Sequence, residues 1–185
     1  RNLTNLGQIA SIDRAYSEVA TPYIYHCEED WLFPTSLFLE ESRAILESDA
    51  KIHAVMVRAP NTMPSHFFTR AIQSLNGTRY WVTVGRAHRK YGALSFNPGL
   101  RRLSDYQAYA PYTHIGLEQD LSVRHKLDGW RLAILEAGDV THIGDNASTV
   151  VQAEKARKRT RMYLLQSLWR RIRMIIFRLS PRSKK

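Results

Sequence analysis

The chain has 185 residues, of which 44% are hydrophobic, and this length and composition suit one globular domain with a core of its own. Its single cysteine, Cys27, excludes an internal disulfide framework and fits a reducing compartment. The formal net charge of +10 belongs to the end of the chain, because residues 155–185 hold 12 Lys and Arg without any Asp or Glu, which leaves residues 1–154 with a net charge of −2. A basic binding surface is therefore expected of the C-terminal segment and not of the domain.

The first 58 residues predict an alternation of helices and strands. Apolar residues at helical spacing predict a helix over 6–19, which Thr21-Pro22 ends because a residue before proline is excluded from the α region. Strands are predicted at 23–27 and 51–58, with a helix at 36–47 between them. The second strand, KIHAVMVR, has aliphatic side chains on both faces, which is typical of parallel sheets covered by helices. We therefore expect an α/β fold with a mixed, mostly parallel sheet flanked by helices.

The second half of the domain is less regular. Residues 60–79 contain Pro60, Pro64 and Asn76-Gly77, and they predict a loop-rich insertion. The remaining predicted elements are strands at 79–84 and 93–97, helices at 101–109 and 119–127, and a last pair of strands at 130–136 and 139–144 around the turn at Gly138-Asp139. The domain is expected to span 1–150, followed by a basic amphipathic helix within 151–185.

Three consecutive carboxylates, Glu28, Glu29 and Asp30, directly follow the predicted strand at 23–27, and Trp31 follows them. In open α/β sheets, ligands bind at the carboxyl ends of the strands. Like charges repel each other, so the stretch is either a solvated acidic loop or the site of a bound cation. A hard divalent cation such as Mg²⁺ or Mn²⁺ prefers carboxylate oxygens and would offset this repulsion.

Two later stretches carry further candidate residues. GLEQDLSVR (116–124) places Glu118 and Asp120 at the start of a helix, where the helix dipole stabilises negative charge, so that capping and catalysis both explain them. VTHIGDN (140–146) places His142 at the end of a strand. This histidine is either a structural residue or, if its strand ends near Asp30, a ligand of Mn²⁺.

In order and spacing, these stretches resemble the C-terminal portion of a GT-A fold glycosyltransferase of the family 2 type. The resemblance covers about residues 5–145 and is carried by three stretches: NLGQIASIDRAYSEVATPYIYHCEEDWLF (5–33), GLEQDLSVRHKLDG (116–129) and VTHIG (140–144). They match a helix and strand that lead into a degenerate D-x-D motif, a Gly-x-Glu-x-Asp motif, and the strand of the metal-binding histidine. The resemblance implies a GT-A-like fold and a transferase of the hexosyltransferase type.

The resemblance also implies roles for single residues. Asp30, the last acid of the D-x-D-like motif, and His142 would bind the Mn²⁺ or Mg²⁺ ion that bridges the nucleotide diphosphate. Either Glu118 or Asp120 would be the base that deprotonates the acceptor hydroxyl. The resemblance does not choose between these two.

Five further residues are implied to bind the donor or the acceptor. Glu28 and, less directly, Glu29 would face the ribose or the metal, and Trp31 would shape the pocket of the donor sugar. In SFNPGLRR (95–102), Asn97 and either Arg101 or Arg102 would line the acceptor or diphosphate side. The alternative for this last stretch is a Pro-Gly turn that begins a helix.

The implied activity is the transfer of a sugar from a nucleotide-sugar donor to a glycan or lipid-linked acceptor, with inversion at the anomeric carbon. The family begins with a βαβ segment that holds the nucleotide, and no such segment precedes the first predicted helix. We therefore expect weak activity, or none, from this piece alone. The alternative is a non-catalytic binding or scaffold protein, a degenerate transferase fold that acts through its basic helix.

The C-terminal residues 161–185, RMYLLQSLWRRIRMIIFRLSPRSKK, predict a basic amphipathic helix, because apolar residues recur at helical spacing and the arginines lie mainly off this stripe. Its candidate partners are an anionic membrane surface, which would place the protein at the cytoplasmic face of the cell membrane, or the chain's own domain or another protein. A nucleic-acid partner is disfavoured, because the basic run lacks the aromatic platforms on which single strands stack. No apolar run approaches the roughly 18 residues that span a bilayer.

Overall fold

The computed structural model describes residues 4–34, 38–65, 68, 72–84, 88–144, 165, 168, 169 and 172. Contacts divide the chain into one unit over 1–144 and a second over 145–185. The predicted C-terminal helix therefore lies outside the described residues, except for Leu165, Leu168, Trp169 and Ile172. None of the helices in the described part of the chain has both the length and the hydropathy needed to cross a membrane.

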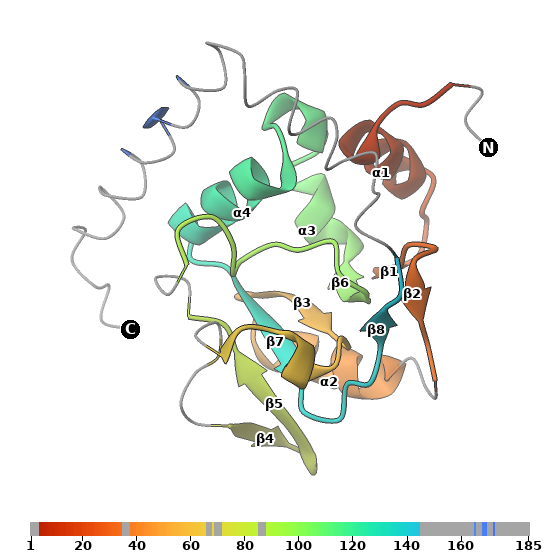
Figure 1. Cartoon of the computed structure of the whole chain (residues 1–185), viewed down its shortest axis with the longest axis vertical. Coiled ribbons are helices and arrows are strands. Elements are labelled where there is room, and N and C mark those ends of the chain that lie inside the picture. The colour runs from red at the N-terminus through yellow and green to blue at the C-terminus, as the bar shows by residue number, and fades with distance from the viewer. Residues whose placement is uncertain are drawn as a thin grey trace. The chain divides into compact units, whose positions relative to one another are not determined.

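A six-stranded sheet forms the centre of the first unit (Figure 1). In spatial order its strands are β1 (Tyr23–His26), β6 (Gly99–Arg102), β3 (Ile52–Met56), β7 (Arg131–Leu135), β5 (Thr78–Val82) and β4 (Gln73–Leu75). Only β3 and β7 pair in parallel, and the other neighbours in the sheet pair antiparallel. A separate antiparallel pair joins β2 (Trp31–Leu32) to β8 (Thr141–His142).

The expected α/β class is confirmed, since helices flank a mixed sheet, but the expectation of a mostly parallel sheet is wrong. It was based on the aliphatic residues on both faces of β3, and all five residues of this strand are indeed buried. Burial of both faces requires only that both faces are covered. It leaves the direction of the neighbouring strands open, and β3 has one parallel and one antiparallel neighbour.

Helices cover both faces of the sheet. On one face, α2 (Leu39–Ser48) packs Ile45 and Leu46 into a cluster with Val55 and Leu100. The other face carries α1 (Gln8–Ser17), α3 (Leu103–Gln107) and α4 (Glu118–Leu127), which pack together in a second, aromatic-rich cluster. Short 3₁₀ helices are η1 (Pro60–Thr62) and η3 (Tyr112–His114). The expected helix–strand order of the first half is thus present, with ends shifted by a few residues.

The second half of the sheet departs from the sequence-based expectation in three places. Asn76 and Gly77 have φ values of 51° and 83° and form the tight turn of a β4–β5 hairpin where a loop was expected. The strand expected at 93–97 is instead β6, at 99–102. It lies so close to β3 that a Cβ on Gly99 would be 2.2 Å from the Val55 carbonyl oxygen, and only glycine fits there. Finally, β7 and β8 do not pair with each other.

Candidate functional site

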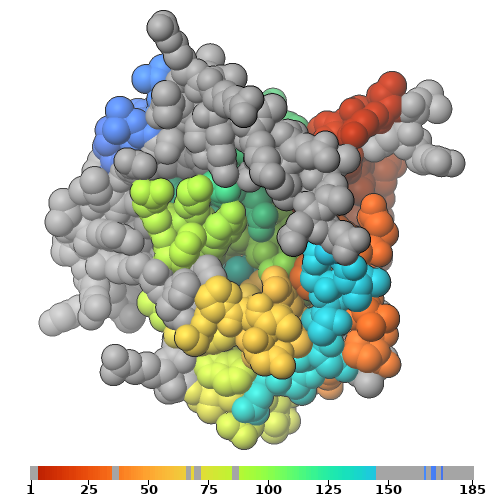
Figure 2. Space-filling view, viewed as in Figure 1, coloured from red at the N-terminus to blue at the C-terminus, as the bar shows by residue number. Residues whose placement is uncertain are grey.

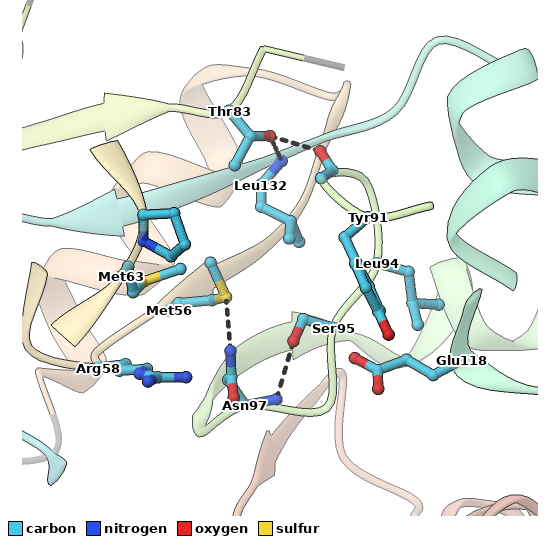
Figure 3. A pocket seen from close by; sticks show the side chains of 12 residues that line it. Met56, Arg58, Met63, Thr83, Tyr91, Leu94, Ser95, Asn97, Glu118 and Leu132 are labelled. Atoms are coloured by element: carbon cyan, nitrogen blue, oxygen red, sulfur yellow. Dashed lines mark hydrogen bonds between the residues drawn. The ribbon is translucent and has the colours of Figure 1, made fainter. Parts of the chain in front are cut away.

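A cavity of about 260 Å³ opens on the face of the domain that Figure 2 shows. Its wall comes from the end of β3, the beginning of β7, the residue after β5, the segment after η1, the loop before β6 and the start of α4 (Figure 3). The twelve lining residues are Met56, Arg58, Met63, Pro64, Thr83, Tyr91, Gly92, Leu94, Ser95, Asn97, Glu118 and Leu132. Half of these residues carry polar or charged side chains and half are apolar, so the cavity offers a ligand both kinds of contact.

Glu118 is the carboxylate of this cavity. It is the first residue of α4, and in Figure 3 its carboxylate points into the cavity. The backbone N–H of Phe96 donates a hydrogen bond to Oε1 over 3.3 Å, and the Ser95 hydroxyl is a second partner. Burial raises the pKa of Glu118 in spite of these bonds, and the charge of Glu28 raises it further, while Arg101 lowers it. A carboxylate with a raised pKa is a better proton acceptor than an exposed one.

Asp120 caps the N-terminus of α4 and does not line the cavity. Its Oδ2 accepts a hydrogen bond of 3.1 Å from the backbone N–H of Leu117, at the beginning of α4. A Cβ at Gly116, which has a φ of 133°, would lie 2.7 Å from the same oxygen. Capping therefore accounts for Asp120, and the structure places only Glu118 of the two candidate bases in the cavity.

Asp30 and His142 meet through the pairing of β2 with β8. Trp31 aligns with His142, and the N–H of Ile143 donates a bond of 2.8 Å to the Asp30 carbonyl. As a result, His142 Nε2 lies 2.9 Å from Asp30 Oδ2. The side chain of a residue at position 144 would disturb this pair, since a Cβ on Gly144 would be 3.0 Å from Oδ2. The strand end of His142 therefore does lie beside Asp30.

The chemistry of this pair fits a divalent metal ion. A carboxylate oxygen and an imidazole nitrogen converge, and Asp30 Oδ1 is buried with no hydrogen-bond partner among the described residues. Carboxylate and imidazole together suit Mn²⁺. The described part of the chain contains no group of three or more His, Cys, Asp or Glu side chains that could hold a metal. An ion bound here would thus need further ligands from a substrate or from water.

The other two acids of the stretch differ in environment. Glu28 is partly buried, and its Oε1 accepts a hydrogen bond of 2.9 Å from the Gln8 side chain. Burial raises the pKa of Glu28, and so do the charges of Asp30 and Glu29, whereas Gln8 lowers it. Glu29 is exposed. Of these three acids, Glu28 and Asp30 have side-chain hydrogen-bond partners among the described residues, Gln8 and His142.

The structure separates the remaining predicted residues. Asn97 lines the cavity, with its side-chain nitrogen 3.8 Å from Met56 Sδ. Trp31 is 8% exposed and belongs to the core, and its ring lies edge-on to His142 with 4.9 Å between centroids. Arg101 is only 1% exposed and lies between the rings of Tyr16 and Phe96. Its Nη2 donates a hydrogen bond of 3.0 Å to the carbonyl of Ser95, which lines the cavity. Arg101 therefore stabilises the loop before β6 without lining the cavity itself.

Arg58 and Tyr91 line the cavity and were not predicted. Arg58 comes two residues after the end of β3. The rule that placed Glu28 and Asp30 at a strand end also applies to Arg58, so its position in the sequence was a usable signal. The sequence around Tyr91 contains no such signal, because only the tertiary fold brings its loop to the cavity.

Comparisons of the chain with protein-family models, with curated proteins and with solved structures return no match.

Proposed function

We propose that the chain belongs to a metal-dependent glycosyltransferase with a GT-A-like fold, which transfers a sugar from a nucleotide-sugar donor to an acceptor hydroxyl. The observation that carries the proposal is a chain of side-chain contacts. It runs from the cavity that contains Glu118, through Arg58 and Trp31, to the Asp30–His142 pair. Arg58 lines the cavity, and its guanidinium lies over the Trp31 ring at 5.4 Å. The same ring contacts His142. A base and a candidate metal pair thus border one face, where the segments around residues 60, 95 and 142 adjoin (Figure 2).

The proposed chemistry uses these groups in distinct roles. Asp30 and His142 would hold the divalent ion, which would supply positive charge to the diphosphate leaving group. Glu118 accepts the proton of the acceptor hydroxyl as its oxygen forms a bond to the anomeric carbon. The bond from that carbon to the diphosphate oxygen breaks, and the electron pair leaves with the diphosphate. The apolar wall of Met56, Leu94 and Leu132 limits the access of water.

Inversion at the anomeric carbon is part of the proposal. Among the described residues that line the cavity, Glu118 is the only carboxylate. A retaining enzyme with a covalent intermediate requires a second nucleophilic group beside the reacting carbon. A single base supports direct displacement by the acceptor, and hence an inverted product.

The test is a screen of nucleotide sugars for Mn²⁺-dependent release of nucleotide diphosphate, made on the complete reading frame so that any residues upstream of Arg1 are included. We expect EDTA and Asp30→Ala to abolish turnover. Glu118→Gln should lower turnover by about 10²–10⁴-fold, the usual contribution of a general base, while leaving the thermal shift by Mn²⁺ and nucleotide intact.

Glu18→Gln is the matched control for Glu118→Gln, because it makes the same change at an exposed glutamate directly after α1 that has no assigned role. Turnover that survives EDTA or Glu118→Gln would contradict the proposal. If no donor is consumed and Mn²⁺ with nucleotide gives no thermal shift, the scaffold alternative is favoured.

We further propose that the C-terminal segment binds an anionic membrane surface at the cytoplasmic face of the cell membrane. Leu165, Leu168, Trp169 and Ile172 are helical and 65%, 54%, 62% and 40% exposed. Their spacing places them on one side of a helix. With the basic residues of 155–185, this apolar side gives the composition of an interfacial helix.

Pelleting with vesicles that contain anionic lipid tests the membrane proposal. Leu168→Asp and Ser167→Asp add the same charge, but only the first removes an apolar side chain from the exposed side. We expect Leu168→Asp to weaken binding at least tenfold more than Ser167→Asp, because burial of a leucine side chain contributes about 1.5–3 kcal/mol. The membrane proposal would be overturned if the two variants weakened vesicle binding equally, or if the parent chain did not bind the vesicles.

A further inference from the structure

Arg58 is a cation of the cavity wall that has no acidic partner in the described part of the chain. Its Nε donates a hydrogen bond of 2.9 Å to the Thr62 hydroxyl, and its Nη2 donates one of 3.0 Å to the Thr62 carbonyl. Neither bond involves a carboxylate, and none of the ion pairs between described residues includes Arg58. The two bonds leave Nη1 available to a ligand.

The guanidinium is held in place before any ligand binds. Thr62, which accepts both bonds, is itself fixed in η1 by bonds from its N–H and hydroxyl to the Ala59 carbonyl, of 3.0 Å and 2.7 Å. The Trp31 ring covers the guanidinium at 5.4 Å, and Ala59 is tied to the segment before β8 by a bond of 2.9 Å to the Val140 carbonyl. The side chain therefore has little conformational freedom left to lose on binding.

Arg58 is also partly desolvated. It is half-buried, and burial lowers its pKa, although an arginine remains charged at any physiological pH. A desolvated cation without a counter-charge raises the free energy of the folded state, and this cost is offset when an anion binds. Figure 3 shows Arg58 and Asn97 projecting into the same end of the cavity, so an anion there would find a second polar group.

We infer that Arg58 is a diphosphate-binding residue, which holds the anion between the cavity and the Asp30–His142 pair. Guanidinium groups bind phosphate oxygens through directed, charge-assisted hydrogen bonds. Arg58 contacts Trp31, and Trp31 contacts His142, so an anion on Arg58 would lie near the candidate metal ligands. The inference rests on the proposed function for the identity of the anion, since a nucleotide-sugar donor carries a diphosphate.

In the assumed reaction Arg58 would act beside the metal ion. Its permanent charge would stabilise the negative charge that the leaving diphosphate gains as the bond to the anomeric carbon breaks. It would also shield that charge from Glu118, the carboxylate of the same cavity. Arg58 is thereby assigned to the leaving group and Glu118 to the acceptor.

The probe is inorganic pyrophosphate alone, titrated into the chain in EDTA at low ionic strength and followed by ³¹P NMR and calorimetry. We expect Arg58→Gln to weaken binding at least tenfold and Arg58→Lys to weaken it by less, because lysine keeps the charge but loses the planar fork. Arg79→Gln is the matched control, since Arg79 is an exposed arginine paired with Glu136 and does not line the cavity. It makes the same change in net charge and should alter binding less than twofold.

Two results would overturn the inference. One is the absence of pyrophosphate binding to the parent chain, and the other is equal binding by Arg58→Gln and Arg79→Gln. Thermal unfolding of each variant shows whether it is folded, and Arg58→Lys supplies the comparison if Arg58→Gln is not. If no sugar donor is ever consumed but pyrophosphate binding depends on Arg58, the anion site stands and the proposed transferase fails. If transfer is found but Arg58→Gln binds pyrophosphate normally, only the inference fails.

Discussion

The histidines of this domain occupy two opposite environments. His142 lies at the edge of the candidate site with 41% of its side chain exposed, and it is paired with Asp30. His53 and His125 are fully buried, with ring centroids 4.6 Å apart, and neither ring nitrogen of His53 has a hydrogen-bond partner among the described residues. The same residue type is thus available to a ligand in one region and sealed from solvent in the other.

The two environments differ in the charge that they permit. Burial lowers the pKa of His125 to about 4 and that of His26 to about 3, and it lowers the pKa of His53 as well. The buried Arg101 disfavours a further positive charge at each of these three histidines. The interior histidines are therefore neutral parts of the core, whereas His142 is partly exposed beside the carboxylate of Asp30. Residue type alone therefore does not identify a candidate functional histidine. Its exposure and its hydrogen-bond partner are both needed.

The largest expected difference between the two regions concerns acid: the buried histidines should lower the free energy of unfolding as the pH falls. Unfolding restores the ordinary pKa of about 6.5 to the buried histidines. Above that pH both states are neutral and the free energy of unfolding does not depend on them. As the pH falls from 6.5 toward 4, the unfolded state binds protons that the folded state does not, so stability decreases by up to about 1.4 kcal/mol per pH unit for each histidine. Urea unfolding at pH 7.5, 6.0 and 5.0 measures this slope.

The buried carboxyl groups act in the opposite direction, because the raised pKa of Glu118 lets the folded state bind a proton first as the pH falls. Comparing the pH slope of a histidine variant with that of the parent removes the contribution of the carboxyl groups, because both proteins share it. His125→Phe keeps an aromatic ring and removes one titrating group, so its slope should be shallower than that of the parent. Parallel slopes for parent and His125→Phe would refute the assignment of His125 as a buried neutral group.

The smallest expected effect is that of the exposed pair on stability. His142→Ala should change the free energy of unfolding by less than about 1 kcal/mol, because exposed ion pairs contribute little and the Asp30 and His142 side chains are 36% and 41% exposed. The same substitution should abolish Mn²⁺ binding, followed by the paramagnetic broadening of NMR signals near Asp30. A loss of stability above about 2 kcal/mol with unchanged Mn²⁺ binding would show that the pair is a structural element.

The local sequence was a good guide to the elements of the first half. The helix at α1 and the strands at β1 and β3 were predicted within a few residues, because the period of the apolar residues and the Thr21-Pro22 stop are local properties. Glu118 and Asp120 at the start of a helix were also predicted, and so was the position of His142 at a strand end. The apolar pattern of β3 correctly indicated burial on both faces.

The partners of these elements were decided by the tertiary structure. Antiparallel pairing of β6 with β3, the close approach at Gly99, and the pairing of β8 with β2 each join segments far apart in the chain. Asp30 and His142 are 112 positions apart, and no local pattern encodes their distance of 2.9 Å. An amino-acid pattern records which faces of an element are buried. It does not record which other element covers them, because that depends on the packing free energy of the whole domain. For the same reason the sequence supplied the candidate acids and the histidine, and only the fold distinguished Glu118 from Asp120, placed Arg101 inside the core, and brought Arg58 into the cavity wall.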